Sequence, residues 1–209
     1  MKRRSEPQPT KAQWSFLVIL GVALLTSCSD TTVPKPRGYP RLDLPDTGYT
    51  MWSGACPFNT EVPDYARMVV HQKAHAEGSL GTDAADTACW TSLRFPGQRA
   101  TVFMTYRRIA QDLPELIDDA HDFKNKHEAK AARINSIRVL RPEAHVFGTL
   151  FEVDGDVASP LVFYLTDSTT HFLYGSLYFD VRPNADSLQP VTDRIRADIR
   201  HFADQLNWR

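Results

Sequence analysis

The residue types of a hydrolytic triad occur together at Asp167, Ser168 and His171. A triad needs a hydroxyl nucleophile, an imidazole base and a carboxylate that orients the imidazole, and separate elements of a fold usually supply them. Here the three residues lie within five positions, which fits a hairpin turn better than a catalytic centre. We therefore expect Ser168 and Thr170 to hydrogen-bond the backbone of a turn, with hydrolysis as the less favoured alternative.

Three carboxylates and an imidazole form a second dense group at Asp118, Asp119, His121 and Asp122. The surrounding sequence predicts an amphipathic helix, and these residues fall mainly on its polar face. A solvated surface is therefore the favoured interpretation. A hydrolase would instead require Asp118 and His121 to converge in a cleft.

His71 and His75 are four residues apart and could bind a metal ion from one face of a helix. No third ligand follows at a characteristic distance, so we expect solvated or packing histidines and no metal. The sequence also lacks the GxSxG, Walker, GxGxxG and HExxH motifs. We accordingly expect no cofactor and no enzymatic activity.

The first 27 residues have the pattern of an export signal. Four basic residues precede an apolar run from Trp14 to Leu25, about 12 residues long, whereas a spanning helix needs roughly 20. Leu25, Thr26, Ser27 and Cys28 then resemble the lipobox of bacterial lipoproteins. We expect cleavage before Cys28 and acylation of Cys28, which would hold the protein on a membrane. The alternatives are an ordinary signal peptide with a chance cysteine, and an uncleaved anchor.

Lipidation of Cys28 would leave Cys56 and Cys89 as an even pair in an oxidising compartment, where a disulfide is the favoured interpretation. It would close a loop of about 33 residues, worth roughly 3–4 kcal/mol in the chain-entropy model. Two buried free thiols are the alternative. A metal site is disfavoured because CxxC spacing is absent, and a catalytic thiol because the sequence places no base beside either cysteine.

The composition is that of a globular protein: 209 residues, 42% hydrophobic, 23% charged, with a net charge of −1. It argues against collagen, a disordered chain and a multi-span membrane protein, and it gives no support for nucleic-acid binding. Cleavage before Cys28 would remove four basic and one acidic residue, which leaves about −4. We expect a signal peptide at 1–27, a lipidated tether at 28–38 and a single domain at 39–209.

Local patterns predict an α+β fold, in which an antiparallel sheet, with a meander in the C-terminal half, is packed by two amphipathic helices. One helix should start after Asp112 and end near Arg133, and the other should follow a cap around Asn184. Asp154 and Gly155 favour a type I′ turn, and Pro160 suggests an edge strand or a bulge. Strands are expected at 39–44, 66–72, 89–95, 100–106, 134–140, 145–153, 157–166 and 172–181.

Aromatic residues occupy two neighbouring strands of this meander, and those that we single out as core or contact residues are Tyr164, Phe172, Tyr174 and Tyr178. Alternation gives the strand at 172–181 an apolar or aromatic character on both faces, which is typical of a central strand buried on two sides. An exposed tyrosine patch for a ligand or partner is the alternative. Arg182 could pair with Asp180 or belong to a contact surface.

Several segments together resemble the gliding motility lipoprotein GldD family of gliding Bacteroidetes. They are PKPRGYPRLDLP from Pro34, Cys56-Pro57-Phe58, Cys89-Trp90, Phe95-Pro96, and the long block FYLTDSTTHFLYGSLYFDVRPN from Phe163. Asp186-Ser187-Leu188 and Pro190 continue the resemblance into the last helix. Pro40 is a departure, since the family more often has an aromatic residue there.

The resemblance implies a non-enzymatic accessory or assembly lipoprotein of the gliding and type IX secretion machinery. Its implied partners are other gliding lipoproteins and type IX secretion components, with no nucleic acid. No catalytic or binding residue carries over from the family. We expect a periplasmic domain on a lipid anchor, with the outer membrane slightly favoured because Ser29 stands where an aspartate retention signal would be. The alternatives are a ligand-binding envelope lipoprotein and, less favoured, a periplasmic hydrolase.

Overall fold

A computed structural model describes residues 44, 46, 48–71, 89–128 and 131–209, without the side chains of 123–128. The predicted signal peptide, the tether with Cys28, and the strand expected at 39–44, except its last residue, lie outside the described residues. The described part is α+β, with antiparallel sheets and two helices, as the sequence predicts.

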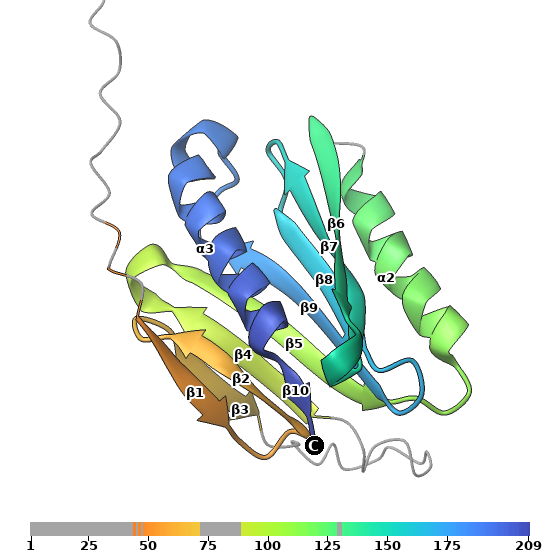
Figure 1. Cartoon of the computed structure of the whole chain (residues 1–209). Coiled ribbons are helices and arrows are strands. Elements are labelled where there is room, and N and C mark those ends of the chain that lie inside the picture. Colours follow the sequence, from red (N-terminus) through yellow and green to blue (C-terminus); the bar gives the residue numbers. More distant parts are fainter. Residues whose placement is uncertain (1–43, 45, 47, 72–88, 129–130) are drawn as a thin grey trace, which may run out of the picture. The chain divides into compact units, whose positions relative to one another are not determined.

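Seven antiparallel strands form the main sheet, in the order β3-β4-β5-β9-β8-β7-β6 (Figure 1). The hairpins β4–β5 and β6–β7 keep neighbours in sequence side by side, whereas β5 pairs with β9 across the intervening helix and meander. The strands are β3 (Arg67–His71), β4 (Cys89–Phe95), β5 (Ala100–Arg108), β6 (Arg133–Arg141), β7 (Val146–Asp154), β8 (Leu161–Thr166) and β9 (His171–Phe179).

A smaller sheet joins distant parts of the sequence, because β2 (Phe58–Pro63) lies between β1 (Tyr49–Ser53) and the two-residue strand β10 (Asn207–Trp208). The sequence pattern predicts no strands in this region. Phe58 is fully buried and contacts both Phe202 and Trp208, so the C-terminal residues help to close the core.

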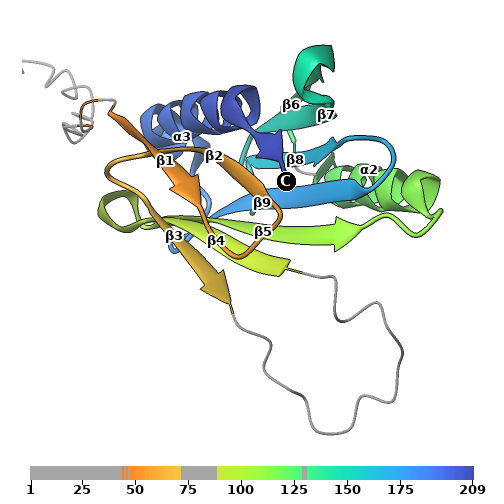
Figure 2. The same ribbon diagram turned by 60° about the horizontal axis from the view of Figure 1, so that its bottom comes forward.

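The two helices α2 (Leu113–Glu128) and α3 (Ala185–Gln205) cover opposite faces of the main sheet (Figures 1 and 2). Successive strand residues point to opposite faces, and on β8 Phe163 meets Phe202 of α3 while Tyr164 meets His121 of α2. The centre of the sheet is therefore buried on both sides. β9 lies at this centre, between β5 and β8, as its two apolar faces predict.

The capping residues at the helix starts act differently in the two helices. Asn184 caps α3, because its side chain accepts a hydrogen bond from the backbone N–H of Ser187 at 3.2 Å. Asp112 precedes α2 as predicted, but its carboxylate accepts from the N–H of Ala110 and from Arg107. The predicted apolar stripe of α3 faces the core, where its fully buried members are Ile195, Ile199, Phe202 and Leu206.

Three of the local predictions are wrong: the end of the first helix, the type of one turn and the start of one strand. The helix expected to reach Arg133 ends at Glu128 in the described residues, and Arg133 begins β6. Asp154 and Gly155 do not form a type I′ turn, since only Gly155 has a positive φ (119°), whereas that turn needs two such residues. The connection instead runs to Pro160, and β8 begins after this proline, four residues later than predicted. β8 lies between β7 and β9, so it is an internal strand and not the predicted edge strand.

Candidate functional site

The predicted triad residues lie at the β8–β9 turn, where Asp167 organises the backbone. Its Oδ1 accepts hydrogen bonds from the N–H groups of Thr169, Thr170 and His171 at 2.7–3.0 Å. Burial alone would raise the pKa of Asp167, but these backbone hydrogen bonds lower it. Ser168 has a φ of 69°, and its own N–H donates to the Thr166 hydroxyl. The three residues thus lie at a turn, as predicted, but the carboxylate of Asp167 holds its backbone, where the sequence predicted the hydroxyls of Ser168 and Thr170.

The imidazole of His171 contacts aromatic partners. Its Nδ1 is 2.8 Å from the Tyr106 hydroxyl, and its ring stacks on Trp208 with centroids 5.1 Å apart. Burial lowers the pKa of His171. A hollow of about 540 Å³ adjoins the ring, and Arg209, which also lines it, donates to the carbonyl oxygens of Gly54 and Cys56. These contacts tie β9 to the small sheet.

The second predicted group separates into two parts on α2. Asp118, Asp119 and Asp122 are exposed, as expected for a solvated face. His121 is half-buried and packs edge-on against Phe151 of β7 at 5.1 Å, so its assignment to the polar face is wrong. The helix turns this imidazole towards the sheet, away from the three carboxylates.

His71 serves the sheet as well, since its Nε2 lies 2.8 Å from the Ser92 hydroxyl on β4. His75 lies outside the described residues. Within the described ranges, no cluster of three or more histidine, cysteine or acidic side chains could hold a metal ion.

The predicted aromatic residues of β8 and β9 divide between the core and the surface. Tyr164 and Phe172 stack at 5.8 Å beneath α2, and Phe172 is 3% exposed. Tyr178 is half-buried and meets the ring of Phe103 on β5 at 6.0 Å. Core packing is therefore found for Phe172 and its partner Tyr164, whereas the contact patch for a ligand or partner stays a prediction.

Tyr174 lies where these two regions meet. It lines an apolar furrow of about 260 Å³ between α2 and strands β5 and β9, together with Leu116, Ala120 and Phe172. Burial raises the pKa of Tyr174 well above its usual value, and the neighbouring Tyr178 raises it further. Phe103, a residue that sequence reasoning missed, lies on the same face of β5 as Thr105, which lines the furrow.

Arg182 is exposed, and the described residues give it no ion pair. Asp180 pairs instead with Arg99 of the β4–β5 turn, at 3.1 Å. The sequence offered no signal for this pairing, which joins residues 81 positions apart.

Cys56 and Cys89 form a disulfide, with Cα atoms 5.7 Å apart. It links the β1–β2 connection to the start of β4, and so fastens the small sheet to the main one. Cys56 has no solvent exposure. This bond is structural, since it cross-links two elements of the fold.

A buried carboxylate cluster on α3 was missed at the sequence level. Asp198 has no solvent exposure and accepts hydrogen bonds from the hydroxyls of Tyr49, at 2.9 Å, and Tyr65. Arg194 lies 3.6 Å from the carboxylate and over the Tyr65 ring. Burial, followed by the hydrogen bond to Asp198, raises the pKa of Tyr49 to about 12.

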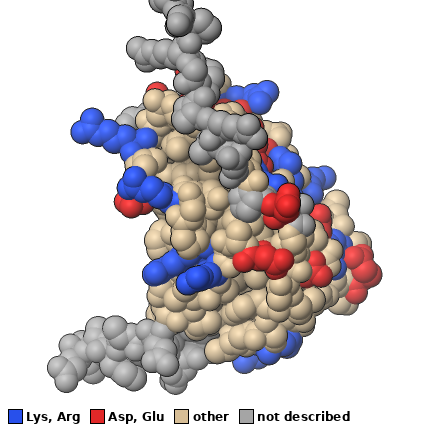
Figure 3. Space-filling model, turned by 90° about the vertical axis from the view of Figure 1, so that its left-hand side faces the viewer, with Lys and Arg blue, Asp and Glu red and all other residues tan. Residues whose placement is uncertain are grey.

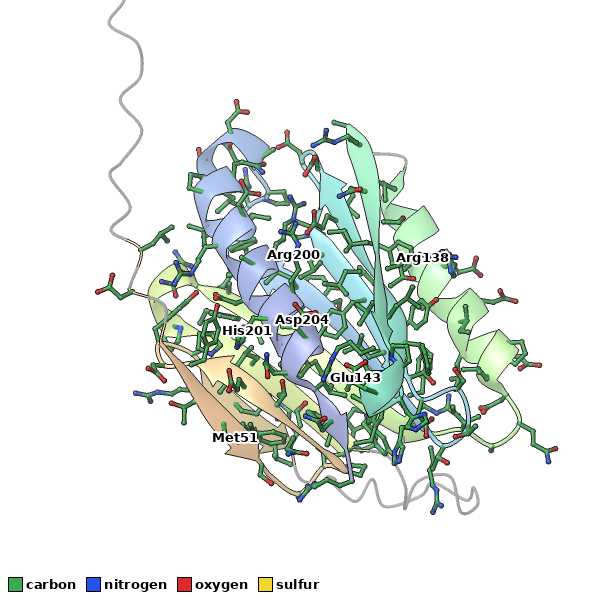
Figure 4. The ribbon with its side chains drawn as sticks, in the orientation of Figure 1. Met51, Arg138, Glu143, Arg200, His201 and Asp204 are labelled. Atoms are coloured by element: carbon green, nitrogen blue, oxygen red, sulfur yellow. A yellow bond between two sulfur atoms is a disulfide. The ribbon has the colours of Figure 1, made fainter. Side chains whose placement is uncertain are left out.

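The same helix face continues to His201, which Figure 4 shows on the side of α3 towards the small sheet. Its Nε2 is 2.7 Å from Glu61 of β2, and its ring stacks on Tyr49. These contacts hold the small sheet on α3. The helical spacing of residues in the sequence could not have indicated these contacts, because the partners lie more than 130 positions away along the chain.

Charges of both signs lie around the small sheet. Figure 3 shows basic and acidic side chains interspersed over a largely uncharged surface on this side, instead of one continuous basic field. Among the described helices, none has the length and apolar composition needed to span a bilayer.

The described fold and its contacts define an α+β protein built on one large antiparallel sheet, whose chemistry-bearing side chains mostly hold elements together. The family model of the gliding motility lipoprotein GldD matches residues 29–208. Because the match spans most of the 209 residues, the chain belongs to the GldD family. Membership links it with gliding motility and with a membrane-anchored place in the cell envelope.

Comparison with curated proteins and with solved structures gave no match.

Proposed function

We propose that this lipoprotein is required for gliding and acts as a non-catalytic accessory or assembly component of the gliding and type IX secretion machinery. The observation that carries the proposal is the family match over residues 29–208. Its proposed partners are other gliding lipoproteins and components of the secretion system.

The contacts of the candidate catalytic groups support a non-catalytic role. Asp167 is occupied by backbone N–H groups, and His171 by Tyr106 and Trp208. A hydrolase would need the Ser168 hydroxyl next to an imidazole base, whereas the described contacts of the His171 imidazole are with Tyr106 and Trp208.

We further propose that an acylated Cys28 anchors the domain on the periplasmic side of the outer membrane. The lipobox-like sequence before Cys28 and the Ser29 that follows it support this placement. Two or three acyl chains give almost irreversible membrane attachment, at about 0.8 kcal/mol per buried methylene.

The furrow beside Tyr174 gives limited support to the ligand-binding alternative. At about 260 Å³ it is smaller than the roughly 300–1,000 Å³ of typical small-molecule sites. An assembly role fits this surface better than enclosure of a ligand.

Deletion of the gene, followed by complementation, tests the proposal. We expect the deletion to abolish colony spreading and to lower the amounts of partner lipoproteins and of secreted proteins. The matched variant Ser168→Gly removes the only hydroxyl of the candidate triad and suits the positive φ there. It should restore spreading fully. Normal spreading of the deletion strain would contradict the gliding role, and a Ser168→Gly protein present at normal amounts without function would contradict the non-catalytic role.

A further inference from the structure

The half of the main sheet formed by β3, β4 and β5 presents aromatic side chains on the face that also bears α2. The strand register places Trp90 beside Thr105, and Phe103 between Ser92 and Ser176, on this face. Phe103 is 49% exposed and Trp90 is 39% exposed. We call this surface the open half-face and define it by Arg67, Trp90, Arg94, Phe103 and Tyr178.

The described helices leave this surface uncovered. α2 contacts β7, β8 and β9, and α3 packs on the opposite face (Figure 2). The apolar stripe of α3 is already buried in the core. Large apolar side chains grouped in this way mark interaction sites more often than chance exposure does.

The shape of the open half-face is a step beside α2. Three strands spaced about 4.8 Å apart give a width of roughly 14 Å, which matches one helix with a diameter of about 10–12 Å. α2 forms the wall of the step, and the 260 Å³ furrow lies at the foot of this wall. A second helix lying next to α2 would complete the layer and could place an apolar side chain in the furrow.

Charge favours an acidic occupant at one end of the step. Arg67 and Arg94 lie directly opposite each other on β3 and β4, and both are exposed. Like charges in this position repel, and within the described part of the chain neither forms an ion pair. Carboxylates at the end of a docked helix would relieve this repulsion and pair with both guanidinium groups.

We propose that the open half-face is a docking site for an amphipathic helix of another protein, with an apolar face over Phe103 and Trp90 and carboxylates at the end that meets Arg67 and Arg94. This inference goes beyond the gliding role, because binding can be measured without motility.

Other occupants fit the step less well. A second copy would have to offer α2, whose outward residues Glu115, Asp118 and Asp122 are exposed carboxylates and match aromatic rings poorly. A flat bilayer would meet the same carboxylates before it reached the recessed aromatic rings. The segment 72–88 of this chain has Leu80 as its one large aliphatic residue, too little for an apolar helix face.

The test uses the full lipoprotein, purified in detergent, and fluorescence anisotropy of a labelled 14-residue peptide. The peptide has leucines at i, i+3, i+4 and i+7 and glutamates at one end, and a scrambled peptide of the same composition is the comparison. We expect saturable binding that Phe103→Ala and Trp90→Ala each weaken at least tenfold. The double variant Arg67→Glu/Arg94→Glu should bind a peptide with lysines in place of the glutamates more tightly than the acidic one.

Leu140→Ala is the matched control, because Leu140 is 64% exposed on the distant edge strand β6. Thermal melting of each variant checks that the domain is folded. The proposal is overturned by equal binding of the scrambled peptide, by no binding of either peptide, or by loss of binding in the Leu140→Ala protein.

Three further results would assign the surface to another occupant and so overturn the proposal. A self-association that Phe103→Ala abolishes would indicate a second copy. Quenching by brominated phosphatidylglycerol in nanodiscs, removed by Trp90→Phe, would indicate a bilayer. Peptide binding that appears only when 73–87 is replaced by a Gly-Ser linker would indicate that this segment already occupies the face.

Discussion

Asp198 is a carboxylate without solvent exposure, held by two tyrosine hydroxyls and by Arg194. Replacement by alanine leaves these partly buried donors without their acceptor, and loss of one partner of a buried charged network typically costs about 3 kcal/mol or more. We expect Asp198→Ala to lower the free energy of unfolding by about 3 kcal/mol in urea titrations.

Asp204 provides the control for this experiment, since it is exposed on the same helix (Figure 4). Asp204→Ala should change the stability by less than about 0.5 kcal/mol. Equal losses for the two variants would mean that the buried cluster contributes nothing specific.

His171 should make stability depend on pH near neutrality. Burial lowers its pKa below the ordinary 6.5, so the folded protein favours the neutral imidazole. The unfolded chain then binds more protons just below pH 6.5, and the sign of linkage requires the stability to fall as the pH drops from about 6.5 towards the lower pKa of the folded state. We expect the melting temperature to decrease as the pH is lowered from 7.5 to 5. His171→Asn should reduce this dependence of the melting temperature on pH. An equally steep slope in the variant would exclude His171 as its source.

At the scale of elements, the Cys56–Cys89 disulfide joins the small sheet to β4. The bond closes a loop of 33 residues, for which the chain-entropy model gives roughly 3–4 kcal/mol. The double variant Cys56→Ser/Cys89→Ser should lose about this much stability in urea titrations. Added reductant should destabilise the unmodified protein and leave the variant unchanged. A reductant effect of equal size on both proteins would contradict this account.

Arg196 joins α3 to the β7–β8 connection. Its guanidinium donates to Asp154 at 2.9 Å and to the carbonyl oxygens of Val153 and Pro160, each at 3.0 Å. Burial alone would raise the pKa of Asp154, but its hydrogen bonds to Arg196 and Arg133 lower it.

Arg196→Ala should cost about 3 kcal/mol, because it removes a buried guanidinium that donates to three acceptor oxygens. It should also speed hydrogen exchange of the amides between Gly155 and Pro160. A lysine cannot reach all three acceptors, so Arg196→Lys should restore little. The exposed Arg182 gives the matched control, and a comparable loss for Arg182→Ala would contradict the role of the buried arginine.

Local signals explain which elements could be predicted. The β4–β5 hairpin and α3 match their predictions because alternation, turn residues and the Asn184 cap are short-range features. The strand β10 was missed because it pairs with β2 about 150 positions away. The exposure of Phe103 was missed for a related reason, since a strand residue becomes core or surface only through what packs over it.

At the scale of the whole molecule, the anchor decides where the domain can act. We expect Cys28→Ala to move the protein from the membrane fraction to the soluble fraction, because no acyl chain can then attach. The domain itself should melt at the same temperature as the lipidated protein, because its core is formed by residues from Cys56 to Leu206.

Loss of spreading in the folded Cys28→Ala strain would show that gliding requires the domain at the membrane. An uncleaved signal peptide could also hold the variant on the membrane, so a second variant is the control. Replacement of the first 28 residues by an ordinary cleavable signal peptide with no cysteine should give the same soluble form. If the Cys28→Ala protein stayed tightly bound to membranes, attachment would have to come from a surface of the domain. The Phe103→Ala and Trp90→Ala proteins would then show whether the open half-face provides that attachment.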